Sequence, residues 1–196
     1  MPVRALPTVR LTLVSPALTA ALREARFDDS GPVEPVTAGP LRLAAGVRVV
    51  GSPSGRCAAT AAALGVDPAA VRPEPALAGC AVGRWRGRRL DELAAAEPES
   101  VAAWLSDPDA APHGGESLRA LRARVAGWLD ALEPGGPGGG AVYAFVEPDV
   151  VRAAVAHALD APDSALWRLD VRPLHAVELS GRAGRWNVRA GVPVGG

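Results

Sequence analysis

The chain has 196 residues with 21 basic and 21 acidic side chains, so its formal net charge is zero. Non-specific nucleic-acid binding and attachment to an anionic membrane surface both need a basic excess, so we expect neither partner. Every basic residue is arginine, and lysine, isoleucine and glutamine are absent, a bias typical of a GC-rich genome such as that of an actinobacterium. Any anion site must therefore use arginine, histidine or backbone N–H groups.

The length suits one domain over residues 1–196, with flexible ends at 1–7 and 191–196. Cys57 and Cys80 lack metal-ligand spacing and are expected to be reduced core residues. No apolar run is long enough to cross a bilayer, and the N-terminal residues lack the pattern of a signal peptide. We expect a cytoplasmic protein that needs no metal and no cofactor.

Strands and helices alternate along the chain. The first strand is expected over Val9–Val14, where both faces carry apolar or small residues, and a helix over Leu18–Phe27 follows it. Further strands are expected over Val47–Gly51, Ala141–Val146, Leu166–Val171, His175–Leu179 and Arg185–Ala190. Further helical segments are expected over Leu41–Ala45, Arg56–Leu64, Arg88–Ala96, Glu99–Leu105, Ser117–Leu132 and Asp149–Leu159. This order predicts a three-layer α/β/α fold with a mostly parallel central sheet.

Two strand ends predict the position of a ligand site. Ser15, Pro16 and Ala17 follow the first strand, and Glu147 follows the strand from Ala141. Ligands of open α/β sheets bind at the carboxyl ends of strands, so we expect these residues to face one pocket. Arg56 begins a helix that Ser52 or Ser54 would cap, and a guanidinium beside helix N–H groups suits an anion. A structural ion pair between Arg56 and Glu147 is the alternative.

Five short sequence motifs occur along the chain, and together, in this order, they are specific enough to indicate a protein family. They are Ser15-Pro16-Ala17-Leu18-Thr19, the run SPSGRCAATA from Ser52, the run LAGCAVGRWRG from Leu77, the run PHGGES from Pro112, and the run FVEPDVVR from Phe145. The endings Trp167-Arg168-Leu169 and Gly184-Arg185-Trp186 agree with them. Over nearly its whole length the chain resembles the histidine phosphatase superfamily, the phosphoglycerate-mutase-like phosphatases. The resemblance implies that fold.

The resemblance also shows where the chain departs from the family. The family's nucleophilic histidine aligns with Pro16, and the phosphate-binding arginine next to it aligns with Ser15. The second pocket histidine aligns with Glu147, and the proton-donating glutamate aligns with Gly79. Arg56 alone remains of the core set. Removing a catalytic nucleophile commonly costs a factor of about 10⁴ to 10⁶, so these departures predict the absence of ordinary histidine-phosphatase activity.

Six residues are candidates for the site. Glu147 is the candidate acid or base, and His113 is a weaker one, because it lies in a glycine-flanked loop that the resemblance places beside the pocket. A solvated histidine is the alternative for His113. Asp149 is expected to cap the helix that follows it. The candidate ligand-binding residues are Arg56, Ser15, Glu116 and Thr19.

Three functional hypotheses follow. The leading one is a repurposed non-phosphatase, a pseudoenzyme that binds a small anionic metabolite or a protein partner, with a homodimer left open. The second is an enzyme of bacterial secondary metabolism that uses Glu147 as acid or base while Arg56 or Ser15 orients the substrate. The third is a residual phosphatase with a substitute nucleophile.

Overall fold

A six-stranded mixed sheet forms the centre of the molecule, in a computed structural model that describes residues 8–27, 30–135 and 140–194. The strands are β1 (Val9–Val14), β2 (Arg48–Gly51), β3 (Arg72–Pro73), β4 (Ala141–Phe145), β5 (His175–Arg182) and β6 (Arg185–Pro193). The α-helices are α1 (Ala20–Arg23), α2 (Gly55–Ala63), α3 (Leu90–Ala96), α4 (Pro98–Ser106), α5 (Leu118–Asp130) and α6 (Pro148–Ala158). The expected flexible N-terminal segment, 1–7, lies outside the described residues.

The strand order β3-β2-β4-β1-β5-β6 places β1 inside the sheet. β1 pairs in parallel with β4 and antiparallel with β5, and β2 pairs in parallel with both β3 and β4. The carboxyl ends of β1, β2 and β4 therefore meet at one edge of the sheet, which is where the sequence places the pocket.

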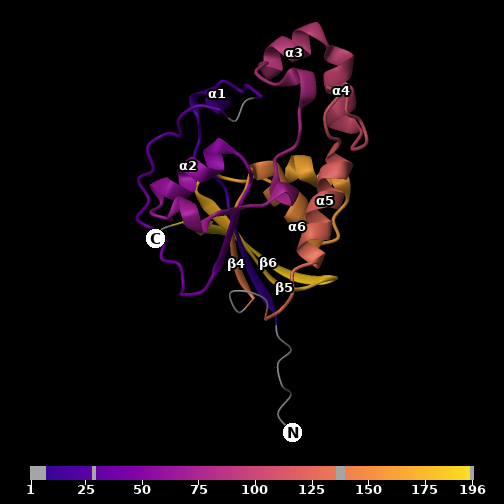
Figure 1. The fold of residues 1–196 in the computed structure, drawn as a ribbon. Helices are drawn as coiled ribbons and strands as arrows, with labels where there is room; N and C mark the ends of the chain where they lie inside the picture. Colours follow the sequence, from indigo (N-terminus) through magenta and orange to yellow (C-terminus); the bar gives the residue numbers. More distant parts are fainter. Residues whose placement is uncertain (1–7, 28–29, 136–139, 195–196) are drawn as a thin grey trace.

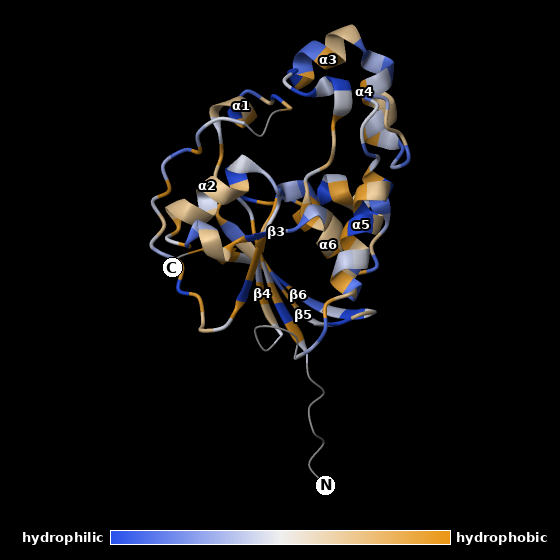
Figure 2. Cartoon of the chain, in the orientation of Figure 1, coloured by the Kyte–Doolittle hydropathy of each residue, from blue (hydrophilic) through white to orange (hydrophobic). Residues whose placement is uncertain are grey.

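Helices cover both faces of the sheet, as expected for three layers (Figure 1). On one face, Leu11 and Leu13 of β1 share a core cluster with Val125 of α5 and Val151 of α6. On the other face, Val14 belongs to a second cluster with residues of α2 and of the segment before β2. Helices beside the sheet carry both hydrophobic and hydrophilic residues in Figure 2, which is the pattern of amphipathic helices.

The helices α3 and α4 extend beyond the sheet and have a small core of their own (Figure 1). Trp85, Leu93 and Val101 are its buried members. Phe27 and Trp104 pack against them, and both rings lie within 5.7 Å of the Trp85 ring, centroid to centroid. Since Trp104 faces this core from α4, the aromatic cluster holds the α3–α4 hairpin to the rest of the chain.

The expected helix over Leu18–Phe27 is wrong beyond its first turn. α1 ends at Arg23, and Ala25 adopts a φ of 52°, which no α-helix can contain. Phe27 then exchanges backbone hydrogen bonds with Arg88 and Gly87, so the chain leaves the helix to join the segment before α3.

Two further expectations are wrong, and a third element is longer than expected. Residues 166–171 form no strand, because a 3₁₀ helix occupies Asp163–Arg168. Leu41–Ala45 is not helical; the Leu41 N–H donates instead to the Leu64 carbonyl at the end of α2. The last strand, expected to end at Ala190, continues to Pro193 as β6, and Val194 after it is buried. The expected flexible end at 191–196 stays a prediction, and its residues 195–196 lie outside the described residues.

Two glycines set the close crossing of the loops at 81–83 and 113–115. A Cβ atom at Gly115 would lie 1.8 Å from the Ala81 carbonyl oxygen. One at Gly83, whose φ is +47°, would lie 2.2 Å from the His113 carbonyl oxygen. Backbone meets backbone here, so neither loop can yield by turning a side chain.

We expect Gly115→Ala to lower the free energy of unfolding by at least about 2 kcal/mol, because the main chain must move to relieve the clash. Gly127→Ala is the matched control, since a Cβ at this exposed position of α5 meets nothing within 4 Å. The control should gain about 0.5–1 kcal/mol from helix propensity. Urea denaturation measures both; equal effects would contradict the close crossing.

Candidate functional site

A cavity of about 810 Å³ opens at the carboxyl edge of the sheet. Ser15 and Pro16 line it after β1, Ser52 and Ser54 after β2, and Glu147 after β4. Its outer wall is apolar and includes Leu22, Phe27, Val82, Trp104 and Trp167. The strand ends that the sequence singled out therefore share one cavity, as expected for an open α/β sheet.

Arg56 and Glu147 form a buried ion pair at the base of this cavity. Their side chains are 3% and 10% exposed. The Arg56 Nη2 group donates to Glu147 Oε2, and Nε lies 3.5 Å from Oε1. Ser54 also donates to Oε1, over 2.7 Å, while its hydroxyl oxygen accepts from the Cys57 N–H and caps α2. The ion pair between Arg56 and Glu147, which the sequence left open as an alternative to an anion site, is therefore present, and both residues line the cavity.

Gly79 provides the space for this pair. A Cβ atom there would lie 3.0 Å from Cγ and 3.4 Å from Cβ of Glu147. Any larger residue at position 79 would push against the Glu147 side chain. A side chain at position 79 would therefore require Glu147 to shift from its place beside Arg56.

Two serine hydroxyls in the cavity lack partners among the described residues. Ser15 is 0% exposed and Ser52 is 6% exposed, and neither Oγ atom makes a hydrogen bond. The Ser15 backbone is held firmly, because its N–H donates to the His175 carbonyl and its carbonyl accepts from the Leu174 N–H. A buried hydroxyl without a protein partner is uncommon in a folded protein.

Asp149 lies in the first turn of α6 and lines the same cavity. It does not cap the helix as expected: Glu147 occupies the N-cap position. Asp149 Oδ2 instead accepts from the Cys80 N–H over 2.6 Å, and Oδ1 accepts from the Val150 N–H over 2.8 Å. Burial raises the pKa of the Asp149 carboxyl, and the negative charge of Glu147 adds to the rise.

Arginines outnumber carboxyl groups in the cavity lining. Arg26, Arg56, Arg86 and Arg152 line it, against Glu147 and Asp149. Backbone carbonyls orient two of them, because Arg26 donates to Gly87 and Arg152 donates to Leu169. Arg56 is paired with Glu147, and Arg26 is paired with Glu24 outside the lining, so these arginines offer guanidinium donors to an anionic ligand more than a large net charge. Sequence reasoning had missed Arg26, Arg86, Arg152 and Asp149 as members of the site.

Three of the predicted site residues lie outside the cavity lining. His113 is 1% exposed; its Nδ1 accepts from the Gly115 N–H, and its ring contacts Trp85 edge-on. Burial and the nearby Arg84 lower the His113 pKa. Glu116 is paired with Arg124 at 2.7 Å, and Thr19 accepts from the Leu22 N–H as the cap of α1. Each of these side chains has a structural role in the fold.

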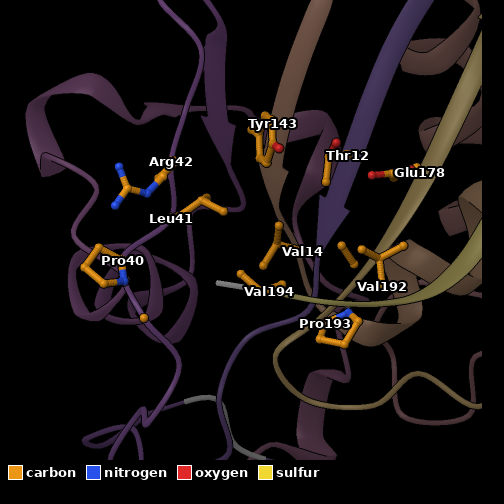
Figure 3. Close-up of a pocket in the computed structure, with 12 residues that line it drawn as sticks. Thr12, Val14, Pro40, Leu41, Arg42, Tyr143, Glu178, Val192, Pro193 and Val194 are labelled. Carbon is orange, nitrogen blue, oxygen red and sulfur yellow. The ribbon is translucent and has the colours of Figure 1, made fainter. Parts of the chain in front are cut away.

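A second cavity, of about 660 Å³, lies on the sheet face opposite α5 and α6 (Figure 3). Thr12, Val14 and Tyr143 of the sheet line one side, and Leu41 and Arg42 line the other. Figure 3 shows Arg42 far from Glu178, so the two charged groups do not converge. The first cavity remains the candidate site.

Among the described residues, no helix has the length and apolarity needed to cross a membrane. Within the same residues, no group of three or more histidine, cysteine, aspartate or glutamate side chains is placed to hold a metal ion.

The family profile of the histidine phosphatase superfamily (branch 1) matches residues 39–191. The chain belongs to the histidine phosphatase superfamily. The matched range begins after β1, so the block from Ser15 to Thr19 lies outside it. No curated protein sequence matches the chain.

Solved structures of this superfamily fold resemble the chain over almost its full length. A mycobacterial glucosyl-3-phosphoglycerate phosphatase is 22% identical, with a TM-score of 0.72 over 95% of this chain and 99% of that one. The alpha-ribazole phosphatase of Shigella flexneri is 18% identical, with a TM-score of 0.75 over 96% of each chain. Bacillus stearothermophilus YhfR is 18% identical, with a TM-score of 0.75 over 95% of this chain and 98% of that one.

These findings correct the leading functional hypothesis. The prediction of a repurposed non-phosphatase, with either a pseudoenzyme's binding role or a new chemistry at Glu147, is wrong. The chain belongs to a phosphatase superfamily, and similar structures are named as phosphatases. The third hypothesis, a residual phosphatase, fits the findings better. The predictions of an actinobacterial source and of a role in secondary metabolism have no support from the comparisons.

We expect Glu147→Ala to lower the free energy of unfolding by about 3–5 kcal/mol, because it leaves the Arg56 guanidinium buried without its partner. The double variant Arg56→Met/Glu147→Leu removes both charges and should recover most of that loss. Urea denaturation at pH 7 measures the two variants against the wild type. A double variant as unstable as Glu147→Ala would contradict this account.

The raised pKa of Asp149 predicts a pH-dependent stability. Its contribution is full below the ordinary value of 3.8 and declines as the pH rises through the higher value in the folded state. The neutral amide in Asp149→Asn has no such loss, so the stability of this variant relative to the wild type should rise between pH 4 and pH 8. Thermal unfolding over that range measures it, and a constant difference would count against the shift.

Proposed function

We propose that this chain hydrolyses phosphate monoesters in the cavity at the carboxyl edge of the sheet, with residues other than the family's histidines. Membership of the superfamily supports the reaction class. The excess of arginine in the lining supports the charge of the substrate. The start of α2, a helix of nine residues, adds backbone N–H groups beside Arg56 for the phosphate oxygens.

The unpartnered hydroxyl of Ser15 is the single observation that carries the proposal. It is the first side chain after β1 and lines the cavity together with Arg56. In the proposed step the Ser15 Oγ–phosphorus bond forms while the bond from phosphorus to the alcohol oxygen breaks. The hydroxyl proton passes to water. A water molecule then attacks the phosphoserine and the bond from phosphorus to Ser15 Oγ breaks, which releases inorganic phosphate. Oγ takes a proton back from water, so the hydroxyl is restored.

Two features make the proposed enzyme slow. The position of the family's nucleophilic imidazole aligns with Pro16, so the neighbouring Ser15 would have to act in its place, and no histidine among the described residues lines the cavity as a base. Such losses commonly cost a factor of about 10⁴ to 10⁶. The substrate phosphate must also compete with the Glu147 carboxylate for the Arg56 guanidinium. We therefore propose a residual phosphatase, in which the family's catalytic residues are replaced. A location in the cytoplasm stays a prediction, as does the formation of a homodimer or of a complex with another protein.

We expect purified protein to hydrolyse 4-nitrophenyl phosphate slowly, and Ser15→Ala to lower kcat at least about 10²-fold. Ser180→Ala is the matched control, since Ser180 is exposed on β5 and lies outside the cavity lining. Trapping with substrate should add the mass of one phosphoryl group to the wild type and not to Ser15→Ala. The proposal fails if the wild type shows no turnover above buffer, and the role of Ser15 fails if its variant keeps full activity.

A further inference from the structure

The two carboxyl groups of the cavity have different partners. Glu147 is bound to the Arg56 guanidinium and to the Ser54 hydroxyl. Asp149 has no guanidinium partner among the described residues and accepts only two backbone N–H groups, from Cys80 and Val150. Pairs of acids whose surroundings differ in this way divide the roles of acid and base between them.

The position of Asp149 corresponds to that of a group the site lacks. The family's proton-donating glutamate aligns with Gly79, which has no side chain. A Cβ atom built at Gly79 would lie 3.7 Å from Asp149 Oδ1. The carboxyl of Asp149 therefore occupies the space beside position 79, reached from α6 instead of from the loop at 78–82.

We propose, on the basis of the phosphatase function above, that Asp149 is the catalytic proton donor to the leaving alcohol. The bond between phosphorus and the alcohol oxygen breaks, and that oxygen takes the Asp149 proton, so the product leaves as a neutral alcohol. Asp149 is then a carboxylate. It takes a proton from the water that attacks the phosphoserine, which restores the acid for the next turnover.

Burial and the charge of Glu147 favour the protonated form of the Asp149 carboxyl over the groups that oppose it. Burial is the main cause of its raised pKa, and Glu147 on the same segment adds to it. Arg152 of α6 and the two backbone N–H groups act in the opposite direction. Arg124 of α5 and the Cys80 thiol also face it, and the thiol, whose own pKa is raised to about 12, stays neutral. An exposed aspartate in the first turn of a helix would be ionised instead.

The test compares two leaving groups in Asp149→Asn. An alkyl phosphate needs a proton on its departing oxygen, whereas 4-nitrophenyl phosphate departs as a stable phenolate. We expect the variant to lose about 10²- to 10⁴-fold in kcat/KM with the alkyl phosphate and less than about 10-fold with the aryl phosphate. Because the proton donor must be protonated, kcat/KM for the alkyl phosphate should fall at alkaline pH in the wild type. This fall should be absent in Asp149→Asn.

Asp160→Asn is the matched control. Asp160 is exposed after α6, and asparagine tolerates its φ of 48°. The control should keep wild-type rates with both substrates. Infrared difference spectra of wild type against Asp149→Asn, without substrate, should show a protonated carboxyl near neutral pH in the wild type.

The possible results separate the two proposals. Equal losses with both substrates, no loss with either, or an ionised Asp149 in the infrared spectra would overturn the proton donor while leaving the phosphatase function standing. A wild type that hydrolyses neither substrate would overturn the phosphatase function itself, and this step with it.

Discussion

The buried ion pair between Arg56 and Glu147 is the interaction on which the candidate site depends. Taking either ion out of water alone would cost several kcal/mol, so each side chain requires the other. The pair joins the start of α2 to the start of α6, and Ser54 extends it by capping one helix while it donates to the carboxylate of the other. In the proposed phosphatase it would also limit the strength of phosphate binding, because a phosphate gains the guanidinium only at the expense of Glu147.

The cavity holds two kinds of charged group: the ion pair of Arg56 and Glu147, and Asp149, whose carboxyl can gain or lose a proton. Arg56 and Glu147 neutralise each other inside the protein. Asp149 stands next to them with a raised pKa and backbone partners only. The two buried acids differ in their partners, because Glu147 is paired directly with a guanidinium whereas Asp149 makes hydrogen bonds only to backbone N–H groups. A single carboxylate beside Arg56 could not supply both a stable structure and a mobile proton.

Strand ends and helix starts could be predicted from the sequence, and loop positions could not. Val9–Val14 is a strand with the expected bounds, because its apolar residues suit a buried central position. The predicted strand ends and helix start are enough to place Ser15, Arg56 and Glu147 in one cavity. They do not place His113, because its position depends on the tight crossing at Gly115, which only tertiary structure shows. Asp149 looked like a helix cap, and nothing in its own segment revealed that the loop at Cys80 would bury it.

The crossing of the loops at Gly83 and Gly115 has a consequence for how this site could change during evolution. Main chain meets main chain at this crossing, so its geometry does not depend on which side chains project from the strand ends. Substitutions at Ser15, Pro16 or Glu147 alter the chemistry of the cavity without altering this crossing. A scaffold of this kind can lose one set of reactive groups and acquire another through successive folded intermediates, each of which still presents an arginine-lined hollow to solvent.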